Sequence, residues 1–158
     1  YFIAPLSFIY NDDIDMYFIF RSLYSKFWTN LSAMSSIDDG MIISLSKTFE
    51  DLLLASHPLL FNHILRLNVQ PLQIAFPWIF SAFSHYLDVE EVIILWEKII
   101  AYDNLDLIPI LAASIFLFRS EILFRYAKST KDVQNIFSNG SRLKVLPLLQ
   151  TMLFQHQI

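Results

Sequence analysis

Few side chains in this sequence have the type and spacing that chemistry requires. The histidines do not fall at the spacing of metal ligands, and no His-Glu-x-x-His motif exists. Each histidine is therefore predicted to be a surface or half-buried polar residue rather than a ligand. The chain has no cysteine, which removes disulfides, thiolate metal sites and a cysteine nucleophile together. The histidines concerned are His57, His63, His85 and His156.

The acidic residues Asp12, Asp13 and Asp15 form a cluster that resembles part of a cation site. The glycine and the closing glutamate of a calcium loop are missing, so a negatively charged helix start is the favoured interpretation. The chain also lacks a Gly-x-Ser-x-Gly motif, and its two glycines cannot build a phosphate-binding loop or a dinucleotide fingerprint. We therefore assign no catalytic, cofactor-binding or metal-binding residue, while a pair of carboxylates from distant segments stays open.

The tryptophans and the basic residues have structural interpretations. Trp28, Trp78 and Trp96 sit on apolar faces and are predicted to be core residues rather than a ligand platform. The basic side chains are scattered, and each is predicted to be a solvated or helix-capping charge rather than a phosphate ligand. Those basic residues are Lys98, Arg119 and Arg125.

The composition describes an apolar-rich domain or a large piece of one. The chain has 158 residues, of which 55% are apolar and 16% charged, against roughly 45–50% and about 25% in ordinary soluble domains. This excess predicts a thick helical core, or surfaces that further chain normally covers. The first residue is Tyr1 rather than Met, and residues 1–10 are already apolar, so we interpret the chain as a fragment.

The net charge of −4 and the lack of any basic stripe argue against a nucleic-acid partner, because phosphate binding needs clustered positive charge. The same charge gives no support to binding an anionic membrane surface. A transmembrane segment is not expected either, because spanning needs ~20 apolar residues. The longest apolar run, residues 107–118, lies between Asp106 and Arg119 and contains Pro109, which predicts a buried core helix.

The elements that must position these side chains are predicted to be helices. Glycine occurs twice and proline six times, so few breakers interrupt the chain. No stretch alternates with a period of two, which predicts essentially no sheet. Start and stop signals divide the chain into about eight helical segments. The segments are expected at about 3–10, at 13–28, from 41, from 58, from 71, at 88–100, at 107–126, at 130–139 and at 141–154.

Several of these helices carry more detailed expectations. The aromatic residues of 13–28 predict burial against several neighbours, and 29–40 is predicted to be the main loop. Pro77 is expected to kink or restart its helix. Asp88 and Glu91 form a capping-box-like pair at a helix start. Residues 107–126 are expected to be the central helix. Thr130 is expected to cap the helix after it, and Pro147 to bend or delay the last one.

An ordered series of motifs carries a family resemblance. Residues 2–6 (FIAPL) precede an acidic helix start at 11–13, and residues 57–63 read HPLLFNH. Residues 76–123 run from an apolar segment around a tryptophan, through an acidic helix start and Leu-Trp-Glu, to a nearly all-apolar helix. The series resembles the C-terminal half of the TBC domain of GTPase-activating proteins for Rab-type GTPases. Within that family, the sequence of these motifs is most similar to that of one numbered member.

The resemblance implies both architecture and function. It covers residues 1–126 as the C-terminal part of an all-α TBC domain, with residues 127–158 as a C-terminal helical extension. It implies a GTP-bound Rab-type small GTPase as partner, a role in vesicle trafficking and no cofactor. It also implies a cytoplasmic protein that is peripheral to membranes through its GTPase partner.

The residues with which this family does its chemistry are expected upstream of the matched region. The family supplies an Arg from an Ile-x-x-Asp-x-x-Arg motif and a Gln from a Tyr-x-Gln motif in trans. Residues 9–15 mimic the first spacing but end in Asp15, and no tyrosine has Gln two residues later. No catalytic residue is therefore transferred, and this chain alone is predicted not to accelerate GTP hydrolysis.

Two alternatives remain open at this point. The family commonly has Phe-Arg-Trp where residues 76–78 read Phe-Pro-Trp, and the loss of that Arg suggests a TBC-like binding module or scaffold without catalysis. An unrelated helical bundle, membrane-associated through its hydrophobicity, would also produce apolar helical periodicity.

Overall fold

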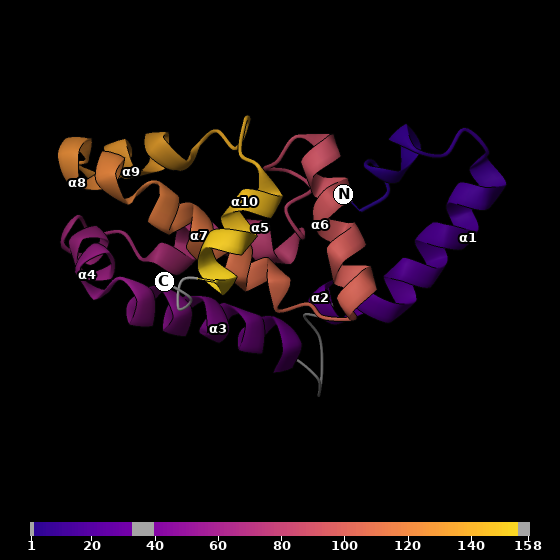
Figure 1. Cartoon of the computed structure of the whole chain (residues 1–158), viewed down its shortest axis with the longest axis horizontal. Helices are drawn as coiled ribbons and strands as arrows, with labels where there is room; N and C mark the ends of the chain where they lie inside the picture. The colour runs from indigo at the N-terminus through magenta and orange to yellow at the C-terminus, as the bar shows by residue number, and fades with distance from the viewer. Residues whose placement is uncertain (1, 33–39, 155–158) are drawn as a thin grey trace.

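A computed structural model describes residues 2–32 and 40–154 of the chain. In those ranges the regular elements are all helical and no strand occurs, which confirms the predicted all-α fold. Figure 1 labels most of the helices. The elements are η1 (Leu6–Phe8), α1 (Asp13–Leu23), η2 (Tyr24–Trp28), α2 (Thr29–Ser32), α3 (Gly40–Ser56), α4 (Pro58–Arg66), α5 (Pro71–Phe80), α6 (Val89–Tyr102), α7 (Leu107–Phe118), α8 (Ser120–Tyr126), α9 (Thr130–Phe137) and α10 (Val145–Leu153).

Helix α7 is the centre of the fold. It packs against α3, α10, α5 and α6, and Figure 1 shows α3 running along it and α10 crossing it. Because α7 is apolar nearly all round, it can be buried on every side. Its Phe116 ring lies 5.3 Å from Phe49 of α3, 5.9 Å from Trp78 of α5 and 4.3 Å from Phe137 of α9, measured between ring centroids.

The predicted single helix over 107–126 is wrong. Helix α7 ends at Phe118, α8 begins at Ser120, and the two axes differ by 45°. The break occurs at Arg119, whose buried guanidinium donates hydrogen bonds to the carbonyls of Ile136 and Asn139. A straight helix would continue the apolar pattern, but those contacts hold Arg119 against the end of α9.

The prediction that the aromatic residues of 13–28 are buried against several neighbours is wrong for the part that forms α1. Phe27 and Trp28 in η2 are buried, but α1 buries no residue. Ile14, Tyr17 and Phe18 of α1 are 66%, 55% and 58% exposed. The reason is that α1 packs mainly against η1 and η2 and stands apart from the α3–α7 bundle (Figure 1).

The helix also extends further than expected. It passes through the π-helical turn η2 and continues as α2 to Ser32, so the predicted loop does not begin at residue 29. The Thr29 hydroxyl donates a hydrogen bond to the Tyr24 carbonyl at 2.7 Å, so this carbonyl has a side-chain partner within the wider π-helical turn. The rest of that predicted loop, 33–39, lies outside the described residues.

Two prolines were expected to disturb the helices that are α5 and α10. Pro77 does not restart α5 as a separate segment, because the helix runs through it to Phe80. The chain then turns at Ala82 and Phe83, both with left-handed backbone at φ 45° and 64°. The last helix, α10, begins at Val145 rather than 141, which agrees with the expected delay, and Pro147 lies in its first turn, where a missing N–H costs nothing.

Side-chain caps begin three of the helices. The Asp12 carboxylate accepts from the Ile14 amide at 2.7 Å, which confirms the predicted acidic helix start. Nδ1 of His57 accepts from the Leu60 amide at 3.2 Å at the start of α4. The cap of α9 is Ser129 and not Thr130, because the Thr130 hydroxyl instead donates to the Leu67 carbonyl at 2.8 Å.

Candidate functional site

The chemically capable side chains do not meet in one place. In residues 2–32 and 40–154, no group of three or more acidic or histidine side chains is placed to hold a metal ion. The rings of His57 and His63 both lie near Phe124, with ring centroids 5.7 and 5.0 Å from it. His85 is exposed, and His156 lies outside the described residues. The prediction of surface or half-buried histidines is therefore confirmed for the three that are described.

The tryptophans are core residues, as predicted, with all three buried. Trp28 and Trp96 pack with ring centroids 4.9 Å apart, and the Phe2 ring stacks on Trp28 at 5.0 Å. The Trp96 indole N–H donates to the Ala82 carbonyl at 3.0 Å, which holds the strained turn that follows α5. Trp78 stacks on Tyr86 at 4.2 Å.

Arg119 is a buried capping charge. Its planar guanidinium donates to the Ile136 and Asn139 carbonyls at the end of α9 and lies 5.6 Å from the Phe137 ring centroid. Carbonyls at a helix C-terminus carry partial negative charge, so a cation is favourable there. Arg125 is exposed and pairs with Glu121 at 2.7 Å. These contacts confirm the predicted structural roles for both arginines.

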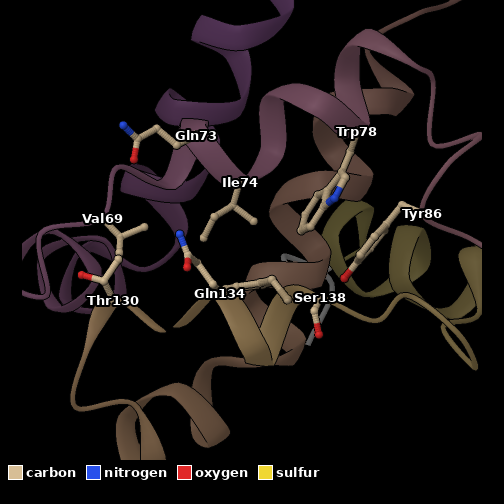
Figure 2. A pocket seen from close by; sticks show the side chains of 9 residues that line it. Val69, Gln73, Ile74, Trp78, Tyr86, Thr130, Gln134 and Ser138 are labelled. Atoms are coloured by element: carbon tan, nitrogen blue, oxygen red, sulfur yellow. The ribbon is translucent and has the colours of Figure 1, made fainter. Parts of the chain in front are cut away.

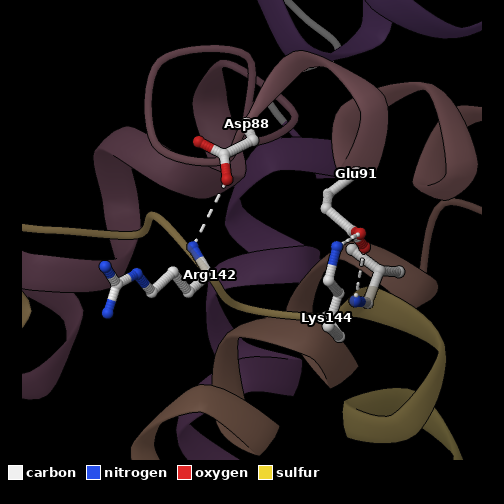
Figure 3. A network of polar contacts seen from close by, with 5 residues as sticks. Asp88, Glu91, Arg142 and Lys144 are labelled. Atoms are coloured by element: carbon white, nitrogen blue, oxygen red, sulfur yellow. Dashed lines mark hydrogen bonds and ion pairs between the residues drawn. The ribbon is translucent and has the colours of Figure 1, made fainter.

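Two carboxylates at the start of α6, one just before it and one in its first turn, reach across to the chain segment that precedes α10 (Figure 3). Glu91 is only 5% exposed. Its Oε1 accepts from Nζ of Lys144 at 2.7 Å, and its Oε2 accepts from the Val145 amide at 2.9 Å. The Asp88 carboxylate accepts from the Arg142 amide at 3.3 Å. We call Asp88 and Glu91, with the amides they hold, the acidic clamp.

The acidic clamp overturns the predicted capping box. Asp88 is the residue before α6, yet its side chain makes no cap hydrogen bond there. Glu91 instead satisfies the first amide of α10, which has no partner inside its own helix. The signal for this was present in the sequence, because Glu91 lies on the same apolar face as Val92 and Leu95. A carboxylate on a buried face needs partners from elsewhere.

The clamp also changes the electrostatics of its basic partner. The hydrogen bond from Glu91 raises the pKa of Lys144 above its usual range, and the charges of Glu91, Glu90 and Asp88 act in the same direction. Lys144 therefore stays a cation throughout the physiological range. The group is a structural connection between α6 and α10.

A cavity of about 350 Å³ lies between α5, α9 and the turn that carries Tyr86 (Figure 2). Its lining combines apolar and neutral polar side chains, among them Trp78, Gln73 and Gln134. The Tyr86 hydroxyl is buried there without a hydrogen-bond partner in the described part of the chain. Burial raises the pKa of Tyr86 to about 12, although the charge of Arg119 acts against this. The phenol is therefore neutral and unsuited to act as a base.

The described helices include none that meets the length and hydropathy requirements of a membrane span by itself. The pair α7 and α8 meets them only when taken together, and the 45° bend separates its two parts.

The motif residues that carry the family resemblance hold the fold together. Leu6 of the first motif is buried, as are Leu60 and Ile64 in and just after the second. The tryptophan of the Leu-Trp-Glu motif anchors the turn after α5, and the acidic helix start supplies the clamp. The shared pattern therefore specifies a helical scaffold rather than a reactive group.

These helices and motifs belong to a known class of protein. The sequence model of the Rab-GTPase-TBC domain matches residues 1–123, and the chain belongs to this family. A similar protein is TBC1 domain family member 19 from Homo sapiens, 39% identical over 153 residues, which are 97% of this chain and 29% of that relative. It is the numbered family member whose sequence the motifs of this chain resemble. The chain thus spans less than a third of the curated relative's length, and no solved structure matches.

Proposed function

We propose that the protein carrying this chain stimulates GTP hydrolysis by a Rab-type small GTPase, with this chain as the C-terminal part of its TBC domain. The observation that carries the proposal is the family match over residues 1–123. The all-helical fold around α7 supports it, because the motif residues occupy the packed positions of that fold. The same match removes the alternative of an unrelated helical bundle.

The proposed division of labour follows from what the chain lacks. A trans-acting Arg neutralises charge that develops in the transition state, and a Gln orients the attacking water; the Arg is worth roughly 10³–10⁵ in rate. This chain contains neither motif. Its Arg119 is buried against carbonyls and its Arg125 is paired with Glu121. We infer that the chain shapes the domain and the reactive side chains come from other parts of the protein.

The domain division is part of the same proposal. We propose that residues 1–126 belong to the TBC domain and that residues 127–158 are a C-terminal extension. In this arrangement α9 packs on α8, and α10 packs on α7 and α6. The proposed site of action is the cytoplasm, at membranes that carry the GTPase.

Single-turnover GTP hydrolysis tests the function. A panel of GTP-loaded Rab proteins is mixed with the full-length protein, with residues 1–158 alone, or with buffer. We expect the full-length protein to accelerate hydrolysis by at least one Rab, and residues 1–158 to leave the intrinsic rate unchanged. Acceleration by residues 1–158 would refute the assignment of the reactive side chains to other parts of the protein.

A second candidate is a TBC-like module that binds a GTPase without activating it. The observation in its favour is Pro77, which stands where the family commonly has Arg. Pro77 is exposed and α5 continues through it, so the change removes a surface charge without breaking the helix. Saturable binding of a GTP-loaded Rab by the full-length protein, with no change in hydrolysis rate, would favour this candidate over the first.

A further inference from the structure

Asn139 and Gly140 lie in the connection between α9 and the segment that leads to α10. Asn139 is the only asparagine in the sequence that is followed by glycine, and it is exposed to water. The side-chain carbon of an asparagine is open to attack by the backbone nitrogen of the next residue, because the product is a five-membered imide ring. A glycine in that next position has no Cβ to obstruct the approach of the two atoms.

Packing requires the glycine at position 140. Gly140 is buried, and a Cβ added to it would lie 2.1 Å from the Tyr86 carbonyl oxygen, which is too close for two non-bonded atoms. Its φ is not positive, so the requirement is steric and not conformational. The residue that leaves Asn139 open to attack is therefore one that this fold cannot replace without moving its backbone.

A backbone donor holds and polarises the side chain of Asn139. Its Oδ1 accepts a hydrogen bond from the Ser141 amide at 2.8 Å. Negative charge develops on this oxygen when the backbone nitrogen attacks the side-chain carbon. A fixed N–H donor at an oxygen that gains charge lowers the barrier, as the donors of an oxyanion hole do. The turn therefore activates the carbon that is attacked.

Arg119 acts on the peptide group that supplies the attacking nitrogen. Its buried guanidinium donates to the Asn139 carbonyl oxygen, and that carbonyl is conjugated with the Gly140 nitrogen. The nitrogen attacks after losing its proton, and the resulting negative charge is shared with the carbonyl oxygen. A cation hydrogen-bonded to this oxygen stabilises the anion. Within residues 2–32 and 40–154 the Gly140 N–H donates no hydrogen bond, so its deprotonation breaks none.

We propose that Asn139 is a site of self-modification in the folded protein. Hydroxide removes the Gly140 amide proton, and the nitrogen forms a bond to the side-chain carbon of Asn139. The bond from that carbon to the side-chain nitrogen breaks, and ammonia leaves with a proton from water, which regenerates hydroxide. Water then opens the imide at either carbonyl and leaves an aspartyl or an isoaspartyl residue. The reaction needs only water and does not depend on the proposed GTPase activity.

The isoaspartyl product should disturb the acidic clamp. It lengthens the backbone by one methylene directly before Gly140, which has no free space against Tyr86. The segment that follows carries the Arg142 and Val145 amides, which donate to the clamp carboxylates. A longer backbone shifts both amides away from their acceptors. The aspartyl product keeps the backbone length and an oxygen for the Ser141 amide, so it should leave the clamp intact.

Incubation of the folded full-length protein tests the reaction. Peptide mass spectrometry follows the conversion of amide to acid from a zero-time sample onward. Asn104 is the matched control, because it is also exposed and its Oδ1 also accepts from the amide two residues further on at 2.8 Å, but Leu105 follows it. We expect Asn139 to convert about tenfold faster than Asn104 or more, which corresponds to about 1.4 kcal/mol of activation free energy. Equal rates at the two asparagines would overturn the proposal.

A variant of Arg119 separates activation of the peptide group from simple opening of the chain. Arg119→Met removes the cation and also loosens α9, so the two explanations predict opposite changes. We expect conversion at Asn139 to become several-fold slower. Faster conversion would show that opening of the segment governs the rate, which contradicts activation by Arg119.

Hydrogen exchange tests the effect on the clamp. Electron-transfer fragmentation identifies the isoaspartyl fraction of the aged protein, and in that fraction the Arg142 and Val145 amides should lose protection. Aged Asn139→Gln, whose longer side chain disfavours the ring, should keep it, and so should freshly purified Asn139→Asp. Full protection of both amides in the isoaspartyl fraction would refute the link between the modification and the clamp.

Discussion

Glu91 shows how one residue can serve an element far from its own. It lies on the buried face of α6, where an unpaired carboxylate would be costly. Its two oxygens accept from Lys144 and from the first amide of α10, 53 and 54 residues further along the chain. The residue therefore fixes where α10 begins, and it does so more directly than any residue of α10 itself.

Replacing Glu91 with Gln should destabilise the protein by about 2 kcal/mol, because a charged acceptor becomes a neutral one and one of the two carboxylate oxygens is replaced by an amide nitrogen that cannot accept a hydrogen bond. The free energy of unfolding from urea titration measures this. Glu97→Gln, on the exposed face of the same helix, is the matched control and should change stability by less than about 0.5 kcal/mol. Equal effects of the two substitutions would show that the clamp contributes nothing.

Asp132 gives the α9 cap a defined pH dependence. The Lys128 amide and then the Ser129 hydroxyl donate to its carboxylate and lower its pKa below the usual range. A lowered folded-state pKa stabilises the fold above the unfolded-state value, and this stabilisation is lost as pH falls through the folded-state value. Asp132→Asn should therefore lower the melting temperature at neutral pH, with the difference shrinking below about pH 4. Asp51→Asn, at an exposed position of α3, is the control substitution.

At the scale of elements, contacts between distant segments decide what local pattern cannot. Periodicity predicted the helices and the apolar character of α7, because both depend on neighbours in sequence. It did not predict the end of α7, because the Arg119 contacts lie 17 and 20 residues away. The same reason explains Asp88 and Glu91. Their local spacing is that of a capping box, but their carboxylates accept hydrogen bonds from the distant Arg142 and Val145 amides instead.

Removing the guanidinium of Arg119 should loosen α9 from the rest of the fold. Arg119→Met leaves two carbonyls at the end of α9 without their charged donor, which should cost about 2–3 kcal/mol. Arg119→Lys keeps the charge but loses the planar fork, so its effect should be intermediate. Hydrogen exchange of the α9 amides and urea titration measure the loss. The exposed, paired Arg125 is the control, and Arg125→Met should cost at most about 0.5 kcal/mol.

At the scale of the whole molecule, the sequence predicted the all-helical fold and the family. It also contains neither of the two reactive motifs. The burial of the tryptophans, the acidic helix start at Asp12 and the central place of α7 were predicted correctly, but the end of α7 was not. The exposure of α1 was not, since aromatic periodicity on one helix does not reveal which neighbours cover it. The acidic clamp also escaped prediction, because it joins segments that are distant in sequence.

The open face of α1 should govern how this chain behaves by itself. Ile14, Tyr17 and Phe18 lie at helical spacing on one side and are mostly exposed, so residues 1–158 should self-associate. Replacing all three with Glu should yield a monomer by light scattering with an unchanged helical circular dichroism spectrum. Single substitutions at the isolated exposed residues Leu59 and Tyr102 should leave the association unchanged. A monomeric wild-type chain would contradict this prediction.

The bonds that Glu91 makes beyond residue 126 have a consequence for cooperativity. They cross the proposed limit of the TBC domain and tie its interior to the last helix. The extension and the domain should therefore lose their structure in one transition, and removal of the extension would strand a desolvated anion inside the remainder. We therefore expect that the molecule cannot be divided at the point where the match to the family model ends.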